Sequence, residues 1–331
     1  MTNFNWPVIG HQPIVNYLQT VIKNQRLNHA YLFYGADGLG KSLVAENFIK
    51  SIYCTADNNK PCNKCIYCQQ IKNKTYPDII YIKKEADKKN ITIEQIREAK
   101  IKIQRSTFLS SYKIVLIPQI HTLSLAASNS LLKILEEPTQ QTIFILIAPQ
   151  LTHIPATILS RVQTIKFLPV ATTELDAYLI RQGINRQAAH ELSHLAAGFP
   201  GHLISLMQTP KFLDEYKNEY RILVDGLSGD INQRFKLVEQ IASQANSELA
   251  RQQTKQFLNN FITIIRDSLL IKNMCFDKII CTYLKEDLAV LATKYSARQL
   301  THILYSARSF SGLIDKNINS RLILENLMLE F

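Results

Sequence analysis

The first half of the chain alternates between short apolar runs and stretches in which apolar residues recur every three or four positions. The helical spacing covers residues 43–53, 92–105 and 124–137, and the last helix is predicted to end at Pro138. Strands that alternate with helices are typical of a parallel sheet with helices on both faces. The apolar runs that predict buried strands are 30–34, 78–82, 113–117 and 142–148.

After Pro169 the strand signals fade and helical patterns dominate. Residues 173–207 predict a small helical unit with a break at Gly198 and Gly201. Longer helical patterns follow, for example over 237–271 and 297–313. We therefore expect three domains: an α/β domain over 1–168, a small helical domain over 169–209 and an all-helical domain over 210–331.

Composition narrows the class of protein. Hydrophobic residues make up 46% and charged residues 20% of the 331 positions, which suits a protein with a buried core. No apolar run reaches the ~18 residues of a membrane span, and residues 1–10 do not resemble a signal peptide. We expect a cytoplasmic protein without membrane contact. The net charge of +11 favours polyanionic partners such as DNA, although the basic residues are scattered.

A phosphate-binding loop follows the first predicted strand. The segment Gly35-Ala-Asp-Gly-Leu-Gly-Lys-Ser42 matches the pattern G-x4-G-K-S in full. Gly35, Gly38 and Gly40 allow the backbone to fold around an anion, and the following helix directs its positive end at the phosphates. Lys41 is expected to reach the β- and γ-phosphates and Ser42 to hold Mg²⁺. The sequence therefore predicts a site for ATP or ADP.

The acids that hydrolysis requires are missing from the predicted position. In phosphate-loop enzymes a carboxylate at the end of a neighbouring strand helps to hold Mg²⁺, and another group orients water. The strand 113–117 is followed by Pro118 and Gln119, and neither side chain carries a charge. We assign no catalytic role to the nearby His121. We therefore expect ATP or ADP with Mg²⁺ to bind without hydrolysis.

Four cysteines lie close together between the first predicted helix and the second strand. Their spacing is Cys54-x7-Cys62-x2-Cys65-x2-Cys68. Four thiolates close a tetrahedral zinc site without an open position, so a structural Zn²⁺ is predicted. An iron–sulfur cluster and four free thiols remain as alternatives. Two distant cysteines, Cys275 and Cys281, are expected to be buried thiols.

Several motifs resemble the bacterial clamp-loader AAA+ subunits. They occur in one order: His29-Ala-Tyr-Leu-Phe33, the phosphate loop, the cysteine insertion over about 54–68, Asn129-Ser-Leu-Leu-Lys-Ile-Leu-Glu-Glu-Pro138 and Pro155-Ala-Thr-Ile-Leu-Ser-Arg161. The likeness is strong over about the first 170 residues and weaker beyond, up to Asn317-Ile-Asn-Ser-Arg-Leu-Ile-Leu-Glu325. The resemblance implies a RecA-like AAA+ domain, a helical lid domain and an all-α collar domain for oligomerisation.

Within this family the chain resembles the delta-prime members more than the gamma/tau motor subunits. The motor's acid pair is replaced by Pro118-Gln119, and the polar residue at the end of its fourth strand by Ala148-Pro149. Glycine stands in the segment 198–201 where the motor carries an arginine that senses the γ-phosphate. The resemblance also implies a role for Arg161, with Ser160 before it, as an arginine finger for the ATP site of an adjacent subunit.

The resemblance implies a hetero-pentamer with gamma/tau and delta that loads the sliding clamp, beta, on primed DNA. This chain would be its stator, a component of the DNA polymerase III holoenzyme without ATPase activity of its own. An ATP-hydrolysing subunit of the gamma/tau type or a helicase loader is the first alternative. A small-molecule kinase and a plain DNA-binding module are the others, and the metal cluster and helical tail disfavour the kinase.

Overall fold

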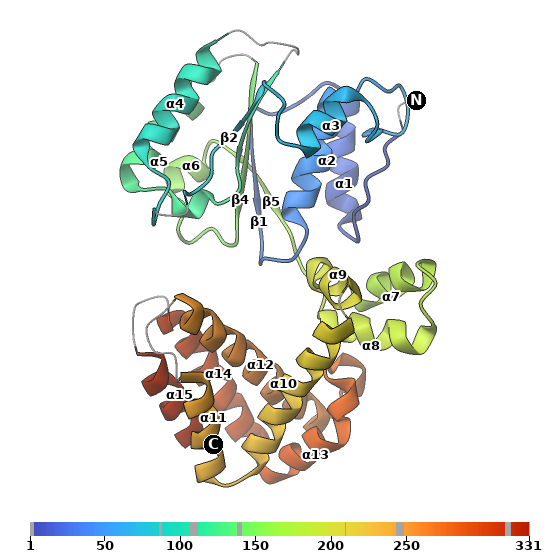
Figure 1. The fold of residues 1–331 in the computed structure, drawn as a ribbon, viewed down its shortest axis with the longest axis vertical. Helices are drawn as coiled ribbons and strands as arrows, with labels where there is room; N and C mark the ends of the chain where they lie inside the picture. The colour runs from blue at the N-terminus through green and yellow to red at the C-terminus, as the bar shows by residue number, and fades with distance from the viewer. Residues whose placement is uncertain are drawn as a thin grey trace. The chain divides into compact units, whose positions relative to one another are not determined.

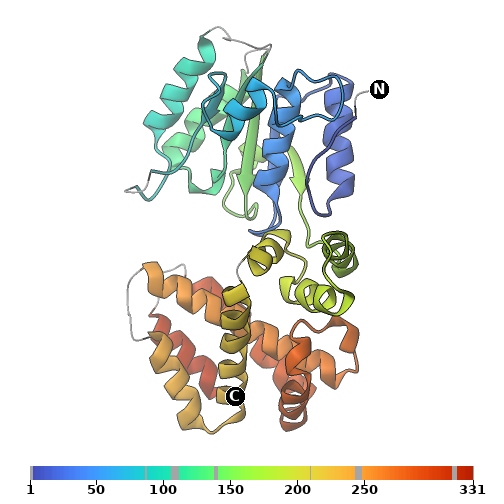
Figure 2. The same ribbon diagram turned by 45° about the vertical axis from the view of Figure 1, so that its right-hand side comes forward.

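The computed structural model describes residues 3–85, 88–105, 112–137, 141–208, 210–242, 248–314 and 319–330 (Figures 1 and 2). Two compact units make up the chain. The first comprises residues 1–178 with 198–201, and the second comprises 179–197 with 202–331. The three domain boundaries expected from the sequence stay a prediction.

A five-stranded parallel sheet forms the centre of the first unit, in the order β2-β3-β4-β1-β5. Its registered pairs include Tyr34 with Ala148 and Ile117 with Leu146, so the carboxyl ends of β1, β3 and β4 share one edge. The parallel sheet predicted from the sequence is confirmed. The strands are β1 (Ala30–Tyr34), β2 (Ile79–Tyr81), β3 (Lys113–Ile117), β4 (Thr142–Ala148) and β5 (Gln163–Lys166).

Helices cover both faces of this sheet, as Figure 1 shows. Residues alternate between the faces, so Tyr31 and Phe33 pack in one core with Phe48, while Leu32 packs in the other with Leu131. Each such buried side chain contributes about 1.5–3 kcal/mol. One face carries α1 (Gln12–Lys23), α2 (Lys41–Tyr53) and α3 (Ile66–Lys72), and the other carries α4 (Ile93–Gln104), α5 (Leu125–Glu136) and α6 (Ala156–Leu159).

Capping residues explain where two of the predicted helices begin. Thr92 and Gln95 form a capping box at the start of α4, and the Ser124 hydroxyl accepts the N–H of Ala127 at the start of α5. The predicted stop at Pro138 lies outside the described residues. Strand β5 carried no sequence signal because only Ile165 of its four residues is buried, and α1 and α3 were not predicted either.

The second unit is built of helices, with α12 at its centre. Helix α12 packs against α13 and α14, and α11 packs against α15. The helical content predicted for this part is confirmed, but the pattern over 237–271 divides into two helices. The elements here are α8 (Arg186–Ala196), α10 (Pro210–Ser228), α11 (Ile231–Ala242), α12 (Glu248–Lys272), α13 (Lys285–Lys294), α14 (Ala297–Ile314) and α15 (Ser320–Leu329), with η2 (Phe276–Lys278) and η3 (Thr282–Leu284).

Helices α7 (Thr172–Arg181) and α9 (Pro200–Gln208) each belong partly to both units, and η1 (Ile120–Thr122) lies in the first. Cys281 is fully buried, as expected, whereas Cys275 is only partly buried. The expectation for Cys275 was wrong because it precedes the short η2 at the surface. No helix in the described ranges is long and apolar enough to span a bilayer.

Candidate nucleotide cleft and metal centre

The phosphate loop joins the end of β1 to the start of α2, as the sequence predicted for these residues. Gly35, Gly38 and Gly40 have φ values of 145°, 82° and 87°. These left-handed conformations favour glycine, because a Cβ atom would be strained there. The loop is therefore a backbone cradle that ends at the positive end of a 13-residue helix.

Lys41 is held inside this cradle. Its ammonium group donates to the carbonyl oxygens of Gly35 and Ala36 and lies 3.4 Å from the Asp37 carboxylate. Burial lowers the pKa of Lys41, and the attraction of Asp37 opposes that shift. His11, which the sequence did not single out, braces the loop through a 2.9 Å hydrogen bond between its Nε2 atom and the Leu39 carbonyl.

A cleft of about 780 Å³ opens beside the loop, at the carboxyl edge of the sheet. This volume lies within the ~300–1,000 Å³ of ordinary ligand sites. The residues at the carboxyl ends of β3 and β4, Pro118-Gln119 and Ala148-Pro149, line it. Gly201, the last residue of the segment 198–201, lines it as well.

Gly201 has no room for a side chain. Its N–H donates to the Gly38 carbonyl at 2.8 Å, and a Cβ atom at this position would lie 2.9 Å from the same oxygen. Any larger residue would displace either the phosphate loop or the start of α9. The backbone contact therefore leaves no space for a side chain at this position.

The cleft fits a polyphosphate better than it fits a magnesium ion. Asp37 and Glu46 are the carboxylates among the described residues that line it. Each is already paired, Asp37 with Lys41 and Glu46 with Lys50 at 2.6 Å. Ser42 is the ligand that the loop itself offers to Mg²⁺, with Pro118 and Gln119 where a second, charged ligand is expected.

Four further lysines line the same cleft and were missed in the sequence. Lys72 and Lys74 come from the end of α3 and the turn after it, and Lys83 and Lys84 follow β2. They come from two separate segments in a chain whose basic residues are scattered. No motif or charge run connects them, so no sequence signal could have found them.

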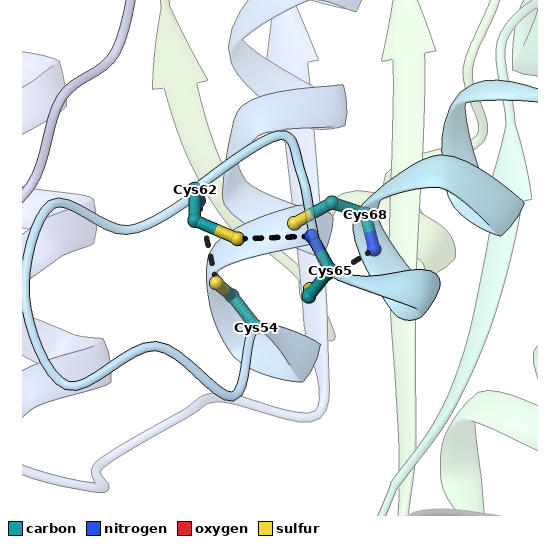
Figure 3. Close-up of side chains that lie close together, drawn as sticks. All are labelled: Cys54, Cys62, Cys65 and Cys68. Carbon is teal, nitrogen blue, oxygen red and sulfur yellow. Dashed lines mark hydrogen bonds between the residues drawn. The ribbon is translucent and has the colours of Figure 1, made fainter.

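The four cysteine sulfurs converge between α2 and α3 (Figure 3). Cys54 directly follows α2, Cys65 caps the start of α3, and all four Sγ atoms lie within 4.8 Å of one another. Tetrahedral Zn–S bonds of ~2.3 Å place sulfurs about 3.8 Å apart, so a small contraction closes the site. The cluster can hold a metal ion and is compatible with a structural Zn²⁺.

Backbone N–H groups donate to the sulfurs and favour the thiolate form that binds metal. Cys62 accepts from Cys65 at 3.2 Å, and Cys54 accepts from Cys62 at 3.3 Å. Donors at Lys64 and Cys65 lower the pKa of Cys62 to about 6, whereas burial raises the pKa of Cys68. The bonds fix the sulfurs in orientations that a metal requires.

Arg161 lies near the amino ends of the parallel strands, whereas the phosphate loop lies at their carboxyl ends. Arg161 stands two residues before β5, whose first residue, Gln163, pairs with Tyr31 near the amino end of the parallel strand β1. The loop follows the other end of β1, about 10 Å further along the strands. Arg161 does not occur among the described residues that line the cleft.

The Arg161 guanidinium is partly exposed and held by local contacts. It donates to the Thr157 carbonyl at 2.9 Å and to the Ser160 hydroxyl at 3.0 Å, and pairs with Glu136 at 2.9 Å. Side-chain exposures of 36% and 48% make this a surface ion pair, worth about 0–1 kcal/mol. An external anion can therefore compete for Arg161 at little cost.

Comparison with known proteins shows which proteins the chain resembles. A family model described as DNA polymerase III, delta subunit matches residues 10–171. The delta' subunit of DNA polymerase III from Bacillus subtilis is 27% identical over 320 residues, which cover 96% of this chain and 94% of that protein. The chain is thus similar to DNA polymerase III subunits of the clamp loader, over nearly its whole length in the case of the delta' subunit. The sheet order and the helices of the structure agree with the predicted AAA+ fold class, a parallel sheet with helices on both faces followed by a helical remainder.

A tau subunit is similar over a shorter part of the chain. The tau subunit from Bacillus subtilis is 37% identical over 161 residues, which are 48% of this chain and 28% of that protein. The chain thus spans less than a third of the length of this relative. Among solved structures, a gamma-subunit-related protein from Thermotoga maritima has 17% identity and a TM-score of 0.41, with coverage of 94% of this chain and 97% of that one.

Proposed function

We propose that this chain is a delta-prime-type stator of a clamp loader, which binds nucleotide without hydrolysing it and lends Arg161 to an adjacent ATPase subunit. One observation carries the proposal: the phosphate loop lies at the carboxyl ends of the parallel strands, and Arg161 lies near their amino ends. A residue near the amino ends cannot serve the chain's own cleft, but it can reach a site on a neighbouring molecule.

The cleft supports the first half of the proposal. Phosphoryl transfer depends mainly on charges placed around the transferred group. Uncharged Pro118, Gln119 and Ala148 line the edge where a motor subunit needs polar and acidic groups. Gly201 in turn packs too closely on the loop to be replaced by an arginine.

In this assembly we assign three roles to the domains. Residues 1–168 would present Arg161, residues 169–209 would form the lid, and residues 210–331 would form the collar that joins gamma/tau and delta in a hetero-pentamer. The complex would act on the beta clamp and primed DNA in the cytoplasm. Contact with DNA would be made mainly to its phosphates, so it would be sensitive to salt and independent of sequence.

Reconstitution tests the proposal. Mixing the full chain with gamma/tau and delta subunits is expected to give a stoichiometric complex on size-exclusion chromatography, with one copy of this chain. Failure to enter any complex, or replacement of gamma/tau by several copies of this chain, would contradict it.

An ATP-hydrolysing subunit of the gamma/tau type is the second candidate, because the tau relative has the higher identity, 37% over the 161 residues that it matches. It would need a carboxylate to hold Mg²⁺. Glu46 is the candidate among the described cleft residues that lies on α2, and its pairing with Lys50 disfavours that role.

A further inference from the structure

The cleft beside the phosphate loop is rich in unpaired positive charge. Lys72, Lys74, Lys83 and Lys84 line it together with Lys41. All four of the additional lysines are exposed, and no carboxylate within the described ranges forms an ion pair with them. The two carboxylates of the cleft pair with other lysines, Asp37 with Lys41 and Glu46 with Lys50. We call the four additional lysines the lysine wall.

Two members of the lysine wall lie against each other. The Lys74 ammonium, which is within hydrogen-bonding reach, lowers the pKa of Lys83, and partial burial adds to this effect. Like charges held together in a cleft are unfavourable, and an anion between them removes the repulsion. The pair is therefore suited to bind a multiply charged anion.

A nucleoside triphosphate normally brings Mg²⁺ with it, since about four negative charges must be neutralised. The usual Mg²⁺ site combines a loop hydroxyl with a strand-end carboxylate. Here Ser42 supplies the hydroxyl, but Pro118 and Gln119 occupy the strand end. The lysine wall supplies in the same cleft the positive charge that the ion would otherwise provide.

The metal centre fixes part of this wall in place. Lys72 is the last residue of α3, which Cys65 caps and which contains Cys68. Ile71, one residue earlier, is buried in the core and lines the cleft too. Closure of the cysteine cluster on an ion thus positions the segment that carries Lys72 and Lys74.

We propose that the cleft binds a nucleoside triphosphate directly on the lysine wall and Lys41, without requiring a divalent cation. This inference rests on the proposed function, since it gives the phosphate loop of a non-hydrolysing subunit a role. The bound triphosphate would fill the cleft and hold together the loop, α3 and the segment after β2. No bond is made or broken.

Calorimetric titration of the full chain with ATP tests this inference. In divalent-free buffer the dissociation constant is expected to change less than about twofold when MgCl₂ is added. The double variant Lys74→Ala/Lys83→Ala is expected to bind at least about tenfold more weakly, which corresponds to ~1.4 kcal/mol. Raising the salt concentration should weaken binding to the wild-type chain steeply, because the contacts are ionic.

The control variant is Lys89→Ala/Lys100→Ala, which removes the same charge from exposed positions that do not line the cleft. It should bind ATP within about twofold of the wild type. Thermal melts and zinc content, measured before and after each titration, establish that the variants are folded and that the metal centre is intact.

Four results would overturn the inference. They are binding only in the presence of Mg²⁺, equal losses in both double variants, no binding of ATP in any buffer, and binding of single-stranded DNA rather than ATP by the lysine wall. Each can occur in a chain that still assembles with gamma/tau and delta and still lends Arg161. Absence of ATP binding would in addition contradict the nucleotide-binding part of the proposed function, whereas the other three results leave that function intact, so the two failures are distinguishable.

Discussion

Replacing Arg161 with alanine is expected to lower ATP turnover at the neighbouring site of a reconstituted clamp loader by about 10³-fold or more, the usual range for an arginine finger. The total ATP turnover of the complex should therefore fall by the fraction that this one site contributes. The reason is electrostatic: the guanidinium neutralises charge that develops on the transferred phosphoryl group. Steady-state ATPase assays on the purified complex give the measurement.

Assembly should survive the Arg161→Ala change, because its ion pair with Glu136 is a weak surface contact. Arg161→Lys should also be impaired, since an ammonium cannot reproduce the planar guanidinium fork. Arg186→Ala serves as the matched control, because Arg186 is an exposed arginine at the start of α8. Full ATPase activity of the Arg161→Ala complex would refute the arginine-finger role.

Removing the metal ligands is expected to have the second large effect. The variant Cys62→Ser/Cys65→Ser should lose a zinc content of about one ion per chain, because two thiolates are too few to close a tetrahedral site. Structural zinc contributes about 10–16 kcal/mol in isolated zinc-finger peptides. Here the loss should be local, since the buried core clusters of the sheet contain no residue of 54–68, and only the partly buried Tyr67 of this segment packs against them.

Metal analysis after purification without chelator, followed by limited proteolysis, measures this effect. Cleavage should increase within residues 55–75 of the double variant, while the sheet remains resistant. Cys275→Ser is the control, because Cys275 lies outside the cluster. Retention of one zinc by the double variant, or iron in place of zinc in the wild type, would contradict the assignment.

Some helices and strands were predictable from the sequence, and others were not. The strand 30–34, the phosphate loop and the helix over 93–104 were predictable because apolar spacing, glycine placement and capping are local signals. The strand β5 was not, because it is an edge strand with one buried residue. The division of 237–271 was missed because both helices carry a helical pattern.

Some residues of the candidate site were likewise predictable from the sequence, and others were not. The cysteine spacing and the loop motif are contiguous, so the residues that the structure brings together there were named in advance. The lysine wall depends on α3 and β2 bringing distant segments to one cleft, and the close approach of Gly201 to Gly38 depends on tertiary packing. Neither contact leaves a trace in a single sequence.

The central claim is that the phosphate loop, at the carboxyl ends of the strands, binds nucleotide without hydrolysis, while Arg161, near their amino ends, serves another subunit. ATP turnover of the isolated chain, measured with saturating ATP and Mg²⁺, tests this claim most directly. Lys41→Ala sets the background, because it removes the cation held in the loop. We expect the two proteins to release phosphate at the same rate. Turnover of the wild-type chain that exceeds this background and requires Mg²⁺ would contradict the account.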